Sequence, residues 1–234
     1  MRSCYKEKEK NLYLLSTNGQ LALFNISNKT SPSLTQEQTI IQSGQTITSV
    51  SFLTADLSLL VGDSSGLVSQ WSKVRGKTNG FTMQKIRAFK VSNKPVVSIN
   101  AEQRRKGFMT VDADGALGIY HSTSEREMIK EQGDGSGVIA ATLSPRADVA
   151  IVQSANNKIS YWQVDNEHPE VSLRSIWQEV WYESYPKPDY IWQSSSANSD
   201  FEPKYSLTPL VFGTLKAAFY AMLVAMPLAL MGAI

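Results

Sequence analysis

Two stretches carry residue types that could bind phosphate or activate a serine, but each lacks an essential member of its motif. Arg75-Gly76-Lys77-Thr78 contains the Gly-Lys-Thr of a phosphate-binding loop, yet Trp71 stands where that loop needs its first glycine. Gly133-Asp134-Gly135-Ser136-Gly137 places a serine among glycines, yet the residue two before Ser136 is Asp134 rather than the glycine of a hydrolase elbow. We therefore expect an ordinary loop at the first stretch and a flexible connection between structural repeats at the second.

Metal-binding patterns are equally incomplete. Asp112-Ala113-Asp114-Gly115 begins like a calcium-binding loop, but the glutamate that such a loop needs at its twelfth position is absent, so we expect a hairpin turn. His121 and His168 are the only histidines, and neither has a cysteine or histidine partner at metal-ligand spacing. We predict no catalytic, cofactor-binding or metal-binding residue, assign no substrate-binding residue, and expect that the chain is not an enzyme.

The charge pattern gives one further candidate. Arg104-Arg105-Lys106 forms a basic turn between predicted strands, which we expect to be a solvated tip, with attraction of an anionic partner as the alternative. A net charge of +2 over 234 residues does not indicate a nucleic-acid partner. Cys4 is the single cysteine and cannot form an internal disulfide, and the polar N-terminal residues show no signal peptide.

The elements that must position these residues form a repeat. Four segments share a small polar turn, an alternating run and a final aromatic residue: Ser16–Phe24, Asp63–Trp71, Asp112–Tyr120 and Ser154–Trp162. Their aromatic residues recur at intervals of about 40–50 residues, which is the repeat length of propeller blades. The turns centre on Asn18-Gly19, Ser65-Gly66, Asp114-Gly115 and Asn156-Asn157, residue pairs that can adopt the positive φ of a tight hairpin.

A strand precedes each turn and its hairpin partner follows, so each unit is a small antiparallel sheet that needs stacked neighbours. Residues 1–165 thus resemble a WD40-like β-propeller, although no unit has the complete Gly-His and Trp-Asp signatures. The predicted fold is mainly β, a partial propeller of about four blades. Since closed rings have up to about eight blades, we expect missing blades upstream. A generic antiparallel β sandwich is the alternative.

Residues 166–205 read as a linker. Leu173, Ile176, Trp177, Val180 and Trp181 follow helical spacing, so we predict a short amphipathic helix. Proline, serine, asparagine and aspartate are then frequent from 186 to 204. Aromatic residues are dense throughout. They either occupy the headgroup layer of a membrane or pack the helix against the propeller, and the sequence does not favour one over the other.

The last stretch, 206–234, has the length and composition of a transmembrane α-helix. After Lys216 it carries no charge from Ala217 to Ile234, which is about the length that crosses the hydrocarbon core of a bilayer. Its alanine, glycine, leucine and methionine residues are tolerated in such helices, as is its internal proline, Pro227. Because the pattern runs to the last residue, we expect the molecule to continue beyond it.

The stretch from Phe201 to Ile234 resembles the opening of the permease domain in phosphate-specific ABC importers. The resemblance rests on Pro209-Leu-Val-Phe-Gly-Thr-Leu-Lys216 and, further on, on Pro227-Leu-Ala-Leu. It extends to long forms of these permeases in Gram-negative bacteria, which carry an extra domain before this segment. It implies a subunit of an importer for inorganic phosphate that works with a second permease subunit, ATPase subunits and a periplasmic phosphate-binding protein. The protein would lie in the bacterial inner membrane, with the propeller facing the periplasm.

Two other functions remain open. One is a membrane-anchored β-propeller scaffold for protein–protein interaction, in which the C-terminal helix is only a tether in the lipid bilayer. The other is a soluble cytoplasmic WD40-like adaptor, whose C-terminal run would pack inside its core. Lys216 is expected at the membrane interface or in the protein interior, with a direct anion contact as the less favoured alternative.

Overall fold

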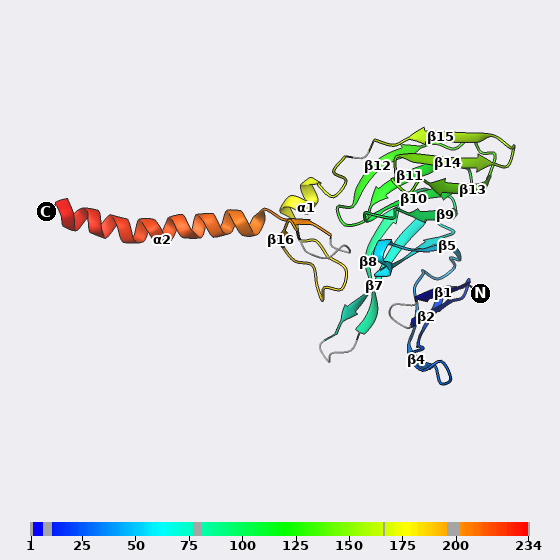
Figure 1. Ribbon diagram of the computed structural model, residues 1–234, viewed down its shortest axis with the longest axis horizontal. Helices are drawn as coiled ribbons and strands as arrows, with labels where there is room; N and C mark the ends of the chain where they lie inside the picture. Colours follow the sequence, from blue (N-terminus) through cyan, green and yellow to red (C-terminus); the bar gives the residue numbers. More distant parts are fainter. Residues whose placement is uncertain (1, 7–10, 77–80, 166, 196–201, 234) are drawn as a thin grey trace.

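The computed structural model describes residues 2–6, 11–76, 81–165, 167–195 and 202–233. Four small antiparallel sheets follow one another along the chain, and a long C-terminal helix projects away from them (Figure 1). Within each sheet the strands pair in sequence order, so every connection joins neighbouring strands.

We number the sheets in chain order. Sheet 1 contains β1 (Arg2–Lys6), β2 (Asn11–Leu15), β3 (Gln20–Asn25) and β4 (Ser33–Thr39). Sheet 2 contains β5 (Ile47–Phe52), β6 (Ser58–Asp63), β7 (Leu67–Arg75) and β8 (Phe81–Lys90), with a short 3-10 helix, η1 (Thr54–Asp56), after β5. Sheet 3 contains β9 (Val96–Ala101), β10 (Gly107–Asp112), β11 (Leu117–His121) and β12 (Arg126–Glu131). Sheet 4 contains β13 (Val138–Leu143), β14 (Val149–Ser154) and β15 (Ile159–Gln163).

The four sheets are copies of one unit. The aromatic residues predicted to mark the repeat all lie on the third strand of their sheet and pair with an apolar residue of the second: Leu12 with Phe24, Leu59 with Trp71, Phe108 with Tyr120, and Ala150 with Trp162. The predicted turns join these two strands in every sheet. Positive φ occurs where it was expected, at Gly19, Gly66, Gly115 and Asn157.

The core lies between sheets rather than within them. Three clusters of buried apolar residues join sheet 1 to sheet 2, sheet 2 to sheet 3, and sheet 3 to sheet 4. Leu15, Leu60 and Val111 represent the three clusters, and each is 1% exposed or less. The first strands of sheets 2, 3 and 4, which are β5, β9 and β13, pack side by side, so these three sheets stack about them. Stacking is required because a single small sheet cannot bury both of its faces.

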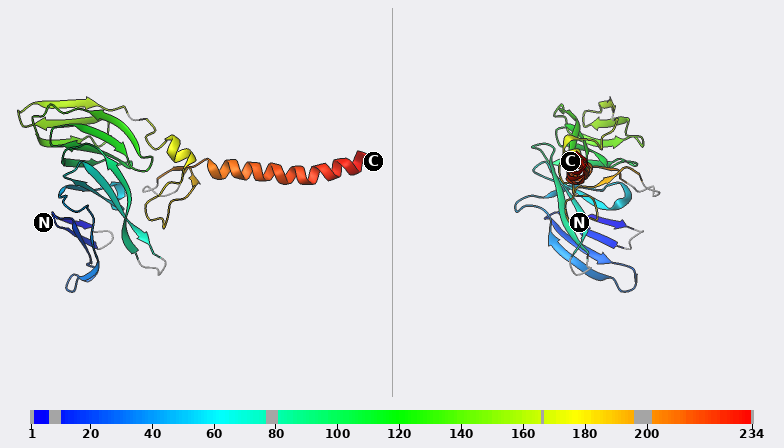
Figure 2. Two further views of the ribbon diagram at one scale, coloured as in Figure 1. Left: turned by 180° about the vertical axis from the view of Figure 1, so that it is seen from behind. Right: turned by 90° about the vertical axis from the view of Figure 1, so that its left-hand side faces the viewer.

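After sheet 4 the chain returns to the side of sheets 2 and 3. It forms α1 (Leu173–Trp177) and a two-stranded sheet of β16 (Trp192–Gln193) and β17 (Lys204–Tyr205), and then enters α2 (Thr208–Ala233). The left view of Figure 2 shows α2 running away from the sheets, and the right view looks along the helix. Its residues from 209 to 233 are all solvent-exposed, and Thr208 at its start is half-buried. The hypothesis of an apolar run packed inside a soluble core is therefore wrong.

The predicted mainly β fold with a short helix and a long apolar helix is confirmed. The short helix is smaller than its apolar spacing indicated. Gln178 adopts an extended conformation with φ −110° and ψ 164°, so Val180 and Trp181 lie beyond the helix. Val180 instead forms an isolated β-bridge with Asp189. This bridge competes with further helical turns, and a five-residue helix has little cooperativity with which to resist it.

Candidate functional site

The stretches whose sequences partly match chemical motifs form turns in the structure. The Asp112 carboxylate accepts hydrogen bonds from the backbone amides of Asp114 and Ala116, at 3.0 and 2.8 Å. Asp63 does the same in sheet 2, where its carboxylate accepts from the amides of Ser65 and Leu67. These carboxylates therefore close equivalent hairpins, which confirms the expected turn at Asp112.

The serine in the glycine-rich stretch is also a turn residue. The Asp134 carboxylate accepts hydrogen bonds from both the amide and the hydroxyl of Ser136, and these bonds lower the pKa of that carboxyl. The stretch joins β12 to β13, so it connects two sheets as predicted. In the other stretch, Lys77 and Thr78 lie outside the described residues.

Buried charge gathers where the C-terminal segment meets sheets 2 and 3. We call this region the junction: Gln70, Arg87, Lys106, His121–Glu125, Pro169–Ser175, Trp181, Glu183 and Glu202. Its centre is an ion pair of 2.5 Å between the Lys106 ammonium and the Glu183 carboxylate, whose side chains are only 7% and 5% exposed. The same ammonium donates to the Thr54 carbonyl at 2.6 Å. The expected solvated tip is therefore wrong for Lys106, although Arg104 and Arg105 are exposed.

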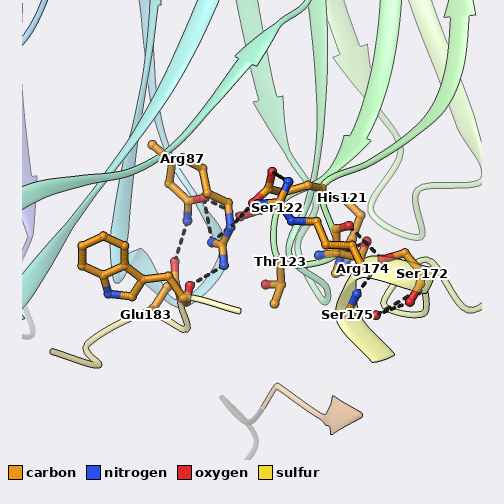
Figure 3. Close-up of polar contacts among 12 residues, drawn as sticks. Arg87, His121, Ser122, Thr123, Ser172, Arg174, Ser175 and Glu183 are labelled. Atoms are coloured by element: carbon orange, nitrogen blue, oxygen red, sulfur yellow. Dashed lines mark hydrogen bonds and ion pairs between the residues drawn. The ribbon is translucent and has the colours of Figure 1, made fainter. Parts of the chain in front are cut away.

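Arg87 forms the second contact with the C-terminal segment (Figure 3). Its guanidinium on β8 donates to the Trp181 carbonyl and to the Gln70 side chain, the latter at 3.1 Å, and lies 3.6 Å from the Glu125 carboxylate. Gln70 also donates to Glu183 at 3.4 Å, which links the two contacts. Burial of the guanidinium lowers the pKa of Arg87, and nearby carboxylates including Glu125 offset part of this effect. A buried arginine is stable here because fixed oxygens surround it.

A third set of contacts orients α1. Ser124 donates its hydroxyl to the Pro169 carbonyl at 2.7 Å, and the Ser172 hydroxyl donates to the Ser124 carbonyl at 3.0 Å. Ser172 and Ser175 cap the first turn of α1 reciprocally. Arg174 then pairs with Glu125 at 2.6 Å. The helix is therefore attached to the turn after β11 through both its backbone and its side chains.

His121 is the buried histidine of this region, and the residue is 2% exposed. Its Nδ1 lies 3.0 Å from the Ser124 hydroxyl. Burial, followed by the positive charges of Arg87, Arg105, Lys106 and Arg126, lowers the pKa of His121 to about 3. The ring is therefore neutral at physiological pH and acts as a hydrogen-bonding partner within the turn. His168, in contrast, is exposed.

A His121→Gln variant should make folding less sensitive to acid. The unfolded histidine binds a proton below its ordinary pKa of 6.5, whereas folded His121 stays neutral down to about 3, so its stabilising contribution is present above pH 6.5 and declines as pH falls. Between pH 7 and 5 the original chain should lose about 2 kcal/mol more unfolding free energy than the variant. Denaturant unfolding at both pH values measures this. His168→Gln is the matched control, and an equal loss in both variants contradicts the assignment.

Glu202 acts in the opposite direction. Burial, followed by the nearby charge of Glu183, raises the pKa of Glu202 above its ordinary 4.5, although it accepts a hydrogen bond from the Thr123 hydroxyl. Ionisation of Glu202 therefore lowers the stability of the folded chain as pH rises above the ordinary pKa of 4.5. The His121 comparison uses one chain against its own variant, so this contribution cancels.

A cavity of about 540 Å³ lies beside the junction, lined by residues that include Arg104, Arg105, Lys106, His121 and Glu202. Among the described residues, no group of three or more histidine, cysteine, aspartate or glutamate side chains is arranged to hold a metal ion. The interactions that the structure does show join one part of the chain to another. The junction is therefore a clamp that fixes the C-terminal segment to sheets 2 and 3.

Sequence reasoning did not find Arg87, Gln70 or Glu183. The available signal was a set of polar residues within apolar, alternating strands: Gln70 and Arg87 stand where burial is expected on β7 and β8. Such residues are buried only when they are paired. Their partners are far away in the chain, so the sequence alone could not name them.

Comparison with solved structures identifies the fold. The chain is similar to a chain of the mitotic checkpoint complex (TM-score 0.51, 15% identity, 67% of this chain and 45% of that one). It is also similar to the C-terminal WD40 domain of Sif2 (0.54, 15%, 69% and 44%). A third similar structure is the β-propeller domain of Cps50 (Swd1) from Myceliophteria thermophila (0.56, 12%, 70% and 53%). The chain spans about half the length of these structures, and its four sheets are WD40-like propeller blades.

No protein-family model and no curated protein sequence matches the chain. The resemblance to a phosphate permease is wrong, because the similar structures are WD40 β-propellers and nothing in the comparisons points to a permease. The run that carried it follows the ordinary helical pattern, in which the Thr214 hydroxyl donates to the Leu210 carbonyl at 2.8 Å. Leucine, alanine, glycine and proline are common in any membrane helix, so the shared letters reflect composition. Without the resemblance, nothing supports the expected importer subunits or the periplasmic orientation.

Proposed function

We propose that this chain is a membrane-anchored β-propeller scaffold that holds protein partners. In this proposal residues 1–165 form the interaction domain, 166–205 an adapter, and 206–234 the anchor in the bilayer. The chain acts by binding and positioning, and we expect no catalytic activity. The fold likeness supports the interaction role, since one similar chain belongs to a multiprotein complex.

The observation that carries the anchor is the exposure of α2. Its 26 residues extend about 39 Å, which exceeds the roughly 30 Å hydrocarbon core of a bilayer. It is the one helix among the described residues that is long and apolar enough to cross a membrane. Large apolar side chains such as Phe212, Leu223 and Leu230 are 54–68% exposed. In water this surface is unfavourable, whereas in lipid it is satisfied.

Lys216 is compatible with this anchor. Its ammonium lies 5.8 Å from the centre of the Tyr220 ring, one helical turn further on. A cation over an aromatic face loses less on leaving water than an isolated one. Lys216 also lies in the first half of the helix, from which a long side chain can extend toward the interface.

Charge introduced in the middle of α2 should release the chain from membranes. A Leu223→Arg/Val224→Arg variant adds two charges, each of which costs about 2.5–3.5 kcal/mol at the centre of a membrane helix. Cell fractionation should find the original chain in membranes, extractable by detergent but not by high salt, and should find the variant in the soluble fraction. Leu34→Arg is the control, because Leu34 on β4 is as exposed as Leu223, at 53% and 54%. Recovery of the original chain in the supernatant without detergent contradicts the proposal.

The scaffold role needs its own experiment. Amine-reactive crosslinking of the full chain in intact membranes, followed by mass spectrometry, should yield links from lysines of the propeller sheets to other proteins. Lys130 on β12 is a suitable reporter because its side chain is 53% exposed. Links confined to this chain contradict the interaction role and leave the anchor unaffected.

A further inference from the structure

The C-terminal segment separates its aromatic residues into two groups. The inner group is Trp181, Tyr182 and Tyr185, which are buried or half-buried. Tyr182 is 3% exposed, and the Trp181 indole donates to the Tyr185 carbonyl at 2.9 Å. The Lys204 ammonium lies over both tyrosine rings, 5.4 and 5.7 Å from their centres.

The outer group is an exposed set of large apolar residues, which we call the collar: Val171, Leu173, Trp177, Tyr190 and Trp192. Their exposed fractions are 37, 81, 51, 37 and 41%, in that order. Arg87, Lys106 and Ser124 make the contacts between the sheets and this segment, so the collar is not needed for them. Five large apolar residues left in water within one short segment form a surface that calls for an apolar environment.

Backbone hydrogen bonds hold the collar at the start of α2. The Ser206 amide donates to the Ile191 carbonyl at 3.1 Å, and the Leu207 amide donates to the Ile176 carbonyl at 3.0 Å. The two acceptors immediately precede Trp192 and Trp177. The Trp192 ring also lies 6.0 Å from the Tyr205 ring across the β16–β17 pair. The two tryptophans therefore flank the residues that enter the helix.

The length of α2 sets the depth of these rings. At about 39 Å the helix exceeds the hydrocarbon core by roughly 9 Å, so a centred helix extends about 4–5 Å beyond the core on each side. The headgroup layer adds about 5–7 Å on each side. The first turn of α2, and the collar beside it, then fall inside that layer. Tryptophan and tyrosine favour this depth because one end of each ring is apolar and the other forms hydrogen bonds.

We propose that the collar is a lipid-binding surface that lies in the headgroup layer and fixes the orientation of the propeller relative to the membrane. This inference rests on the proposed anchor. The lipid surface is the occupant because the collar is continuous with the membrane helix and is held to its first residues. Exposed charges of both signs accompany it, such as Arg174 and Glu179, so a zwitterionic bilayer is sufficient.

Quenching of tryptophan fluorescence by brominated lipid tests this inference. The full chain is reconstituted into phosphatidylcholine vesicles with brominated or ordinary acyl chains, and its flotation with the vesicles is checked first. Brominated lipid should quench part of the emission. A Trp177→Phe/Trp192→Phe variant should lose most of this quenchable part, because it removes the reporters while keeping apolar rings. Trp162→Phe on β15 is the control and should retain it.

The outcomes separate the collar from the anchor. If the chain floats and bromolipid quenches the double variant as much as the original chain, the collar is overturned and the anchor is unaffected. The same conclusion holds if the chain floats and aqueous acrylamide quenches Trp177 and Trp192. Protection from acrylamide without bromolipid quenching shows a protein occupant and also overturns it. Failure to float with the vesicles overturns both the collar and the proposed anchor.

Discussion

Replacing Lys106 by methionine should reduce the unfolding free energy by about 3–5 kcal/mol, because it leaves the Glu183 carboxylate buried without its cation. The pair is 2.5 Å long, and both side chains are nearly inaccessible to solvent. Water therefore cannot replace the lost ammonium without opening the junction. Denaturant unfolding of the sheets measures the loss, and hydrogen exchange should show that the Val180 and Ser206 amides lose protection.

A surface ion pair provides the control for this variant. Lys130 pairs with Glu127 at 3.4 Å, but both side chains are about half exposed, so Lys130→Met should change stability by less than about 1 kcal/mol. A Lys106→Met/Glu183→Gln variant removes both charges and should recover part of the loss, because the uncompensated buried charge is gone. Equal effects of the Lys106 and Lys130 substitutions would contradict a buried clamp.

Replacing Phe108 by alanine should reduce the unfolding free energy by about 3–5 kcal/mol, because the substitution leaves a cavity between two blades. Phe108 on β10 has no exposed surface and belongs to the cluster that joins sheet 2 to sheet 3. Its ring meets Phe89 edge-on at 5.1 Å and stacks on Tyr120 at 5.6 Å. Since Phe89 comes from sheet 2, the variant tests whether stacking between blades carries the stability.

Phe81→Ala is the matched control, since the Phe81 ring at the start of β8 is 53% exposed. Removing it forfeits little burial, and the expected change is within about 1 kcal/mol. Thermal unfolding followed by circular dichroism compares the two variants with the original chain. A Phe108 variant as stable as the Phe81 variant would show that the blades do not depend on this contact.

The repeat could be predicted because its signals are local. A glycine or asparagine with positive φ, an alternating strand and an aromatic residue all lie within about ten residues of one another, and each hairpin forms from its own segment. The apolar character of α2 is equally local, because a run of uncharged residues is visible without knowing what surrounds it. Identity was less accessible: the permease resemblance failed since a membrane helix of any origin draws on the same few residue types.

The junction depended on contacts across the fold. Lys106 meets Glu183 and Arg87 meets the Trp181 carbonyl, pairs that lie 77 and 94 residues apart in the chain. Sequence spacing described Lys106 as part of a basic tip, because nothing nearby indicates that an acid will cover it. The sequence also could not separate the inner from the outer aromatic residues, because both groups consist of tryptophan and tyrosine. Only folding decides which rings are buried, because burial depends on the distant surface that the chain meets when it returns.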